Sequence, residues 1–222
     1  APPASAPQAE NEAGPQPLHM LHSSNRRASK DAFTSEGKYF FQLRSDEAGG
    51  LNLLYLDYAS QSAIVLCEKP NCLHNDETCT SFFPLKYGSA SSCVVKNYLY
   101  LIFSGSKTEN VPPTLFRLSL NGQNRTEIST LPSEFSYSNP IATDGEKLYT
   151  ICNRLEINDE GIGHTFSNLI SIALENGAIE TLRKWNSDAY LWGAENSEMF
   201  IMVPLNSEGS SLNFNVESIN AA

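Results

Sequence analysis

One short segment of the chain concentrates side chains that can bind a metal ion or form a disulfide. It carries three of the five cysteines and one of the four histidines, at Cys67, Cys72, His74 and Cys79. Three thiolates and one imidazole are a recognised ligand set for structural zinc, which takes four ligands at about 2.0 to 2.3 Å. The alternative is a disulfide between two of these cysteines, with the third left free unless it pairs with Cys93 or Cys152. Both chemistries stabilise a structure, and neither is a catalytic signature.

The residues around this segment predict a loop held at both ends. A predicted strand ends directly before it, and apolar residues resume directly after it. Pro70 fixes φ in a tight turn, which would bring the thiols of Cys67 and Cys72 together. A zinc ion with four protein ligands would have no position open for a substrate. The other two cysteines, Cys93 and Cys152, lie on predicted strands and are expected to be buried thiols, because an unpaired cysteine packs as a small hydrophobe.

Beyond residue 33 the sequence is rich in short apolar runs and contains an internal repeat. A polar turn followed by an aromatic strand recurs, with the aromatic at Phe40, Tyr100, Tyr149 and Phe200. After a longer first interval the period is about 50 residues, which is in the range of propeller blades. A hairpin pattern recurs in phase with it, at 54–66, 116–128 and 170–182. Asn121-Gly122 and Asn176-Gly177 predict two-residue type I′ turns in the last two hairpins.

The repeat predicts an all-β fold in which four antiparallel strands form each blade of a β-propeller. Units that begin near residues 33, 84, 135 and 189 would make about three and a half blades, with the 67–79 loop between the first two. We therefore expect the chain to be the front part of a longer propeller. A β-sandwich of two sheets is the alternative fold.

Composition divides the chain into a tether and a folded domain. Residues 1–32 are rich in Pro, Ala, Gln and Glu, which predicts a disordered spacer, and 33–222 would form the propeller domain. The formal net charge of -10 and the scattered Lys and Arg residues argue against a nucleic-acid partner.

Three further residues are candidates for ligand binding. Tyr190 and Trp192 lie close to Trp185 and would stack on a sugar face if exposed, although core packing is the more common role of such residues. His164 follows an acidic, glycine-containing loop and is a candidate ligand contact, or part of a solvated hairpin tip. No catalytic motif is recognisable, although propeller active sites can assemble from separate blades.

The string from Leu66 to Cys79, preceded by Tyr-Leu-Asp-Tyr, resembles a motif of β-propeller lipoproteins of gut Firmicutes. The resemblance covers 33–85 well and the later blades only in general pattern. It implies an extracytoplasmic, cell-surface protein tethered by a lipid-anchored cysteine upstream of residue 1. We expect a binding or interaction scaffold for an unknown protein or glycan ligand. The alternatives are an extracellular propeller enzyme acting on glycans or peptides, and a metal sensor that uses the four Cys and His residues.

Overall fold

The chain folds as a succession of antiparallel β-sheets. The computed structural model describes residues 16–21, 33–35, 38–45, 49–205 and 213–221. Strands dominate this part of the chain, and a short 3₁₀ helix, η1 (Leu85–Tyr87), follows the cysteine-rich loop. The described residues include no helix with the length and apolar character of a membrane span. The prediction of an all-β fold is confirmed.

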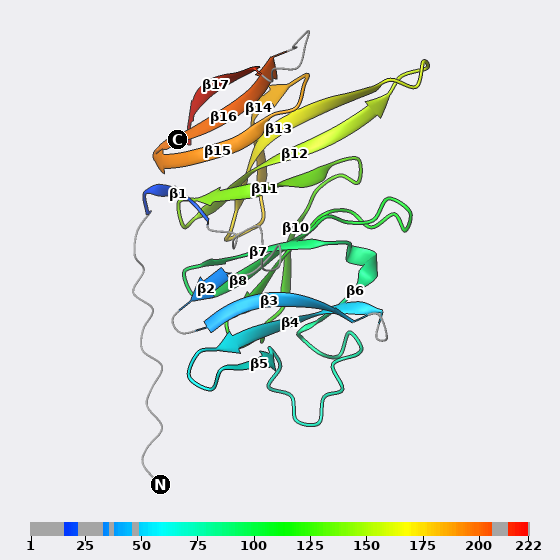
Figure 1. Cartoon of the computed structure of the whole chain (residues 1–222), viewed down its shortest axis with the longest axis vertical. Helices are drawn as coiled ribbons and strands as arrows, with labels where there is room; N and C mark the ends of the chain where they lie inside the picture. Colours follow the sequence, from blue (N-terminus) through cyan, green and yellow to red (C-terminus); the bar gives the residue numbers. More distant parts are fainter. Residues whose placement is uncertain (1–15, 22–32, 36–37, 46–48, 206–212, 222) are drawn as a thin grey trace.

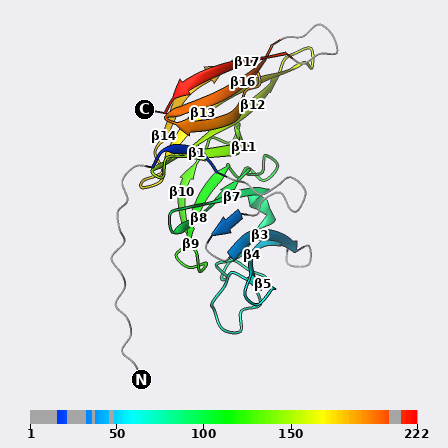
Figure 2. The same ribbon diagram turned by 60° about the vertical axis from the view of Figure 1, so that its left-hand side comes forward.

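The sheets follow one another along the long axis of the molecule in sequence order (Figures 1 and 2). The first sheet contains β2 (Phe33–Ser35), β3 (Lys38–Ser45), β4 (Gly50–Asp57) and β5 (Ser62–Val65), and β6 (Phe82–Pro84) also pairs with β4. The second contains β7 (Ala90–Val95), β8 (Tyr98–Phe103), β9 (Thr114–Ser119) and β10 (Thr126–Thr130). The third contains β11 (Ser136–Thr143), β12 (Lys147–Ile157), β13 (Gly163–Ala173) and β14 (Ile179–Trp185). The fourth contains β15 (Tyr190–Asn196), β16 (Glu198–Leu205) and β17 (Asn213–Asn220).

Each pair of successive sheets buries an apolar core between its faces. The first and second sheets enclose Leu53, Phe83, Leu99, Leu101, Phe103 and Phe116. The second and third enclose Tyr100, Ile102, Leu115, Leu148, Cys152 and Ile170. The third and fourth enclose Tyr149, Ile151, Leu169, Trp185, Leu191 and Ile201. Three successive cores between four sheets are the packing of propeller blades rather than of a two-sheet sandwich.

The recurring aromatic explains why the repeat is visible in the sequence. Tyr100 and Tyr149 occupy the second strand of their sheets and fill the core shared with the following sheet. Phe200 holds the same position on β16 and is partly exposed, on the opposite face of the strand from the buried Met199 and Ile201. The side chain of Phe40 lies outside the residues whose packing is described.

The prediction of a disordered tether over 1–32 is wrong at β1 (Leu18–Met20). This strand pairs antiparallel with β11 on one side and β15 on the other, so that it joins the third and fourth sheets into one eight-stranded sheet. Leu18 is buried in their shared core. The physical reason is that two strand edges facing each other offer unpaired backbone groups, which a short apolar segment can satisfy. Residues 1–15 and 22–32 lie outside the described part of the chain.

The two Asn-Gly hairpins turn in a different way from the one predicted. In each loop the glycine has positive φ, 80° at Gly122 and 72° at Gly177, whereas the preceding asparagine does not. The asparagine instead accepts a backbone hydrogen bond two residues on, from Gln123 N to Asn121 Oδ1 and from Ala178 N to Asn176 Oδ1. The type I′ prediction is therefore wrong, because an Asx-type turn and a longer loop replace it.

The turn between β11 and β12 contains a hydrogen-bonded carboxylate, Asp144, from which we expect a loss of stability in acid. Asp144 accepts hydrogen bonds from the backbone of Glu146 and Lys147 and from the Tyr149 hydroxyl. Partial burial opposes ionisation, but these hydrogen bonds outweigh it and lower the pKa of Asp144 below its ordinary value. A carboxyl with a lowered folded pKa stabilises above its unfolded pKa of about 3.9 and loses that stabilisation as the pH falls.

We expect the urea midpoint of the wild type to fall more between pH 5 and pH 3 than that of Asp144→Asn, which carries no ionisable group at this position. Tyr149→Phe keeps the buried ring and removes one hydrogen bond, so it should show an intermediate pH dependence. Equal acid dependence in all three proteins would contradict the role given to Asp144.

Candidate metal centre

The cysteine-rich loop leaves the first sheet at β5 and returns to it at β6. Its start is fixed by the backbone bond from Leu66 N to Leu53 O, at 2.9 Å, and its end by the bond from Phe82 N to Cys79 O, at 3.2 Å. Because β6 pairs with β4, the chain rejoins the first sheet before it enters the second at β7. The loop therefore lies in the connection between the first two blades, as predicted, but both of its ends belong to the first.

Two tight turns fold the loop back on itself. Asn71 and His74 adopt positive φ of 55° and 56°, which redirects the chain just before Cys72 and just after it. Further on, Asp76 Oδ1 accepts hydrogen bonds from both the backbone and the hydroxyl of Thr78, and these bonds lower the pKa of the Asp76 carboxyl. The backbone N–H of Cys79 donates to Asp76 O at 3.1 Å, so this turn places the last cysteine.

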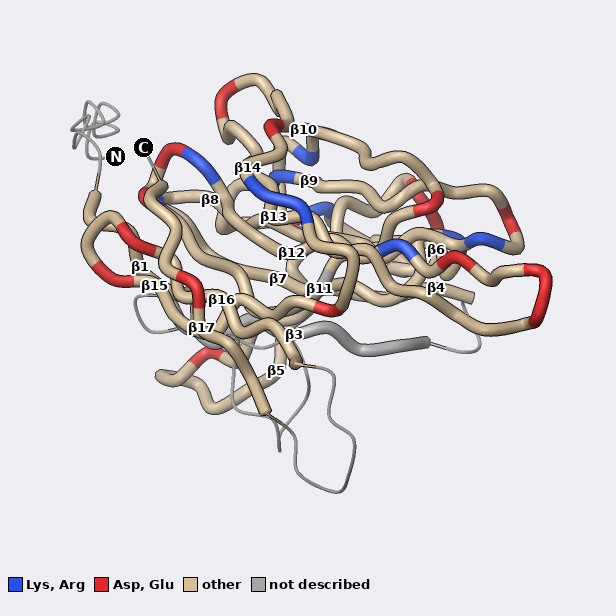
Figure 3. The backbone as a smooth tube through the Cα atoms, turned by 90° about the horizontal axis from the view of Figure 1, so that it is seen from above, with Lys and Arg blue, Asp and Glu red and all other residues tan. Residues whose placement is uncertain are grey.

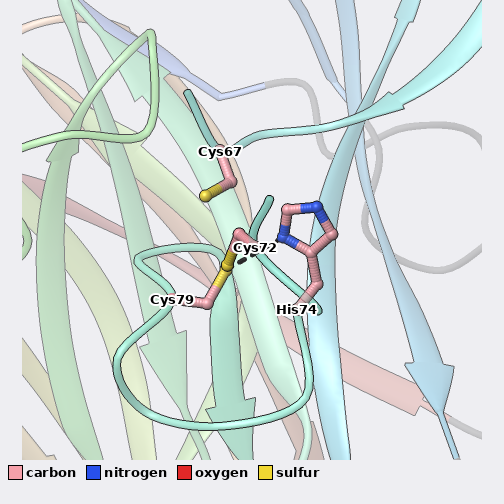
Figure 4. Close-up of side chains that lie close together, drawn as sticks. All are labelled: Cys67, Cys72, His74 and Cys79. Atoms are coloured by element: carbon pink, nitrogen blue, oxygen red, sulfur yellow. Dashed lines mark hydrogen bonds between the residues drawn. The ribbon is translucent and has the colours of Figure 1, made fainter. Parts of the chain in front are cut away.

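The four predicted ligands converge (Figure 4). Their ligand atoms all lie within 4.8 Å of one another, and His74 Nδ1 is 3.3 Å from Cys79 Sγ. Sulfur ligands arranged as a tetrahedron at about 2.3 Å from zinc would be roughly 3.8 Å apart. Cys79 is buried and the other three are half-buried. The donor set and its spacing therefore fit a metal ion, and a small contraction of the loop would close the site.

All five cysteines of the chain are free thiols. The disulfide alternative would use two of the three loop cysteines and would leave His74 without a chemical role. The observed approach of His74 Nδ1 to Cys79 Sγ gives it one. The arrangement is therefore one that could hold a metal ion.

Two polar residues outside the loop support it. Ser81 Oγ is 3.1 Å from Cys79 Sγ, and it donates to Asn52 Oδ1 on β4 at 3.4 Å. Asn52 Nδ2 in turn donates to the backbone carbonyl of His74 at 3.0 Å. If Cys79 binds a metal as thiolate, Ser81 is placed to donate to the sulfur instead, as the groups behind metal ligands commonly do.

The hairpin between β9 and β10 ties the loop to the second blade. Arg125 donates from Nη1 to Phe82 O at 2.7 Å and from Nη2 to Glu77 O at 3.3 Å, and its guanidinium lies 4.8 Å from the centroid of the Phe83 ring. On the same hairpin, the Gln123 amide donates to Glu68. The loop is thus a junction between two blades. Sequence reasoning missed Asn52 and Arg125, since no local spacing links them to the cysteines, and it missed Ser81, which is near Cys79 in sequence but carries no metal-ligand signature.

The other two cysteines are buried, as expected. Cys93 and Cys152 both lie in the core between the second and third sheets, and burial raises the pKa of each thiol to about 12. They are therefore weak nucleophiles at neutral pH and stand apart from the loop thiols.

The remaining candidates do not form one site. Trp185 is buried between the third and fourth sheets, and its indole N–H lies 3.3 Å from both carboxylate oxygens of Glu217. Tyr190 and Trp192 are exposed on β15, on the face opposite Leu191. His164 is exposed near the tip of the hairpin between β12 and β13, which matches the solvated-tip interpretation. Of the predicted aromatic cluster, only Tyr190 and Trp192 remain available to a ligand.

This difference in burial predicts a difference in stability. Trp185 is 8% exposed and Trp192 is 67% exposed. We expect Trp185→Ala to lower the free energy of unfolding by about 3 to 5 kcal/mol, because it opens a cavity between two blades. Trp192→Ala should stay within about 0.5 kcal/mol of the wild type. Urea unfolding measures both, and a loss of similar size at the two positions would contradict the packing described.

Comparison with known proteins defines the class of fold. No family model matches the chain, and no curated protein matches it. The chain is similar in structure to an oligogalacturonate lyase from Vibrio parahaemolyticus, with a TM-score of 0.53 and 14% identity over 91% of this chain and 54% of that one. It is also similar to an oligogalacturonate lyase in complex with manganese, with a TM-score of 0.53 and 12% identity over 94% of this chain and 59% of that one.

These likenesses and the succession of antiparallel sheets with a core between each pair make the fold that of a β-propeller. The chain spans little more than half the length of the two lyases. At this level of identity the likeness concerns the fold.

Proposed function

We propose that this chain is a β-propeller binding scaffold at the cell exterior, with a structural zinc ion held by Cys67, Cys72, His74 and Cys79. The observation that carries the metal centre is the convergence of four protein ligands within 4.8 Å of one another, and the propeller fold supports the scaffold. Cys₃His is a set that zinc accepts as a closed, four-coordinate structural site. A metal so enclosed would fasten the loop to the first blade and, through Arg125, to the second.

Metal content and thiol reactivity, measured on one sample, test the metal centre. We expect about one zinc per chain. The loop thiols should become reactive toward a thiol reagent only after a strong chelator is added, while Cys93 and Cys152 stay protected by burial. Loop thiols that appear only after reduction, in a metal-free protein, would show a disulfide instead.

The proposed location at the cell surface is supported by the resemblance of the Leu66–Cys79 string to a lipoprotein motif and by the Pro/Ala-rich composition before residue 18. Externally added protease on intact source cells tests it. We expect the protein to be degraded while a cytoplasmic marker stays intact. Protection of the protein under these conditions would refute the proposed location.

The enzyme alternative has one observation in its favour, the fold shared with oligogalacturonate lyases. It is tested by incubating the purified protein with oligogalacturonate and Mn²⁺ and measuring chain cleavage. A binding scaffold should leave the oligosaccharide intact, and turnover would favour the enzyme.

A further inference from the structure

A cavity of about 360 Å³ lies on the third blade, well away from the cysteine loop. Its lining includes Phe135, Arg154, Phe166, Asn168, Lys184 and Asn186. It forms where β12 and β13 continue beyond the core shared with the second blade and project as a long hairpin (Figure 1). The volume lies in the range of small-ligand sites.

The strand register explains why these side chains meet. Arg154 on β12 is directly opposite Phe166 on β13, and Asn168 is directly opposite Lys184 on β14. Since side chains alternate between faces along a strand, Phe166 and Asn168 lie on one face, the same face as the buried Ile170. This face is therefore apolar where the second blade covers it and becomes aromatic, amide-bearing and cationic where the cover ends.

Arg154 is held by aromatic rings on two elements. Its guanidinium carbon lies 5.1 Å from the centroid of Phe166 and 6.0 Å from that of Phe135, in the loop before β11. One terminal nitrogen pairs with Glu156 at 2.9 Å. The Nε atom is buried and has no hydrogen-bond partner. A buried donor without a partner is uncommon, so the described residues pair this guanidinium incompletely.

The cavity lining also includes a lysine and two asparagine side chains that could contact a ligand. Lys184 is exposed, and no ion pair joins it to another described residue. Arg183, its neighbour on β14, belongs to the opposite face and pairs with Glu217 at 3.5 Å. Figure 3 shows the basic stretch of β14 in blue. Arg183 and Lys184 are neighbours on this strand, so their side chains lie on opposite faces of the sheet. Asn168 and Asn186 add two amide side chains to the rim.

We propose that this cavity binds a carboxylated sugar, as a monomer unit of an acidic glycan. The Phe135 and Phe166 rings offer apolar surface to the C–H groups of a pyranose ring. The amides of Asn168 and Asn186 can donate to and accept from its hydroxyls. Arg154 and Lys184 supply charge-assisted hydrogen bonds to its carboxylate. This inference rests on the proposed binding function and names its ligand class.

Calorimetric titration with a trimer of galacturonic acid tests the proposal, with the neutral trimer of galactose and inorganic phosphate as matched probes. The wild type should bind the acidic trimer, with a dissociation constant on the order of 0.1 mM, and neither of the other two at that concentration. Lys184→Gln and Arg154→Gln should each weaken binding by about tenfold. Arg183→Gln changes the net charge equally on the opposite face and should bind as the wild type does.

Each other outcome overturns the proposal. Equal binding of the neutral trimer would remove the role of the cations, and equal binding of phosphate would leave an anion site without sugar recognition. Equal weakening by Arg183→Gln and Lys184→Gln would reduce the effect to net charge. Absence of binding in a protein that is folded and carries its metal would refute this ligand class and leave the zinc-locked scaffold standing, since metal content tests that separately.

Discussion

Removal of the metal with a strong zinc chelator should lower the melting temperature of the protein by about 10 °C. A ligand that binds only the folded state stabilises it by about 4 kcal/mol when its concentration is about a thousand times its dissociation constant. For a domain of this size each kcal/mol corresponds to about 2 to 4 °C. The four ligands lie close together only in the folded loop, so metal binding and loop folding are coupled.

His74→Ala should reproduce the effect without chelator and should be insensitive to it. His164→Ala is the matched control, because it removes the exposed histidine of another blade and should keep the full response to the chelator. A melting temperature that is unchanged by the chelator but falls on addition of a reductant would show that a disulfide, and not a metal ion, stabilises the loop. A wild type that responds to neither would contradict any stabilising link among the four residues.

The clustering of the four Cys and His side chains could be predicted from the sequence because these residues are neighbours in the chain. Thirteen consecutive residues carry all four, so the spacing alone indicated a shared loop. The polar residues behind the ligands could not be predicted in the same way. Asn52 reaches the loop from β4, and Arg125 reaches it from the second blade, and only the folded arrangement brings them there.

The blades were predictable because each sheet must bury an apolar face against the next sheet. A residue such as Tyr100 or Tyr149 recurs at a fixed position, since it fills the core between one sheet and the next. Exposure of individual residues was less predictable. Trp185 and Trp192 both lie on predicted strands, yet Trp185 packs between the third and fourth blades and Trp192 faces outward, a difference set by which face of a strand is covered.

The strand at Leu18–Met20 shows the limit of composition as a guide. Its surroundings are rich in proline and polar residues, which indicates disorder. What orders these three residues is the pair of strand edges offered by β11 and β15, more than a hundred residues away in sequence. A short segment can therefore be ordered by partners that its own composition does not reveal.

The second large effect is expected at two hairpin tips, at Gly122 and Gly177, each of which packs against the preceding blade. A Cβ atom added at Gly177 would lie 1.8 Å from the backbone oxygen of Ile128 on β10 of the preceding blade. The same arrangement recurs one blade earlier, where a Cβ at Gly122 would lie 2.3 Å from Leu66 O. Both contacts involve backbone, which cannot rotate away as a side chain can. These glycines are therefore needed for the approach of one blade to the next.

Gly177→Ala should lower the free energy of unfolding by about 3 kcal/mol, the combined cost of positive φ in a residue with a Cβ and of overpacking at the contact. Gly161→Ala is the matched control. Gly161 has a similar φ of 77°, but no atom lies within 4 Å of the position of its Cβ. That substitution should cost about 1 kcal/mol, from backbone strain alone.

Urea unfolding with linear extrapolation measures the difference between the two variants, which isolates the contact between blades from the strain of the turn. Gly122→Ala should resemble Gly177→Ala, because its added Cβ also meets backbone of the preceding blade. Equal losses at Gly161 and Gly177 would mean that the hairpin tip does not press on β10. A large loss only at Gly122 and Gly177 would support close backbone contact between these tips and the preceding blade.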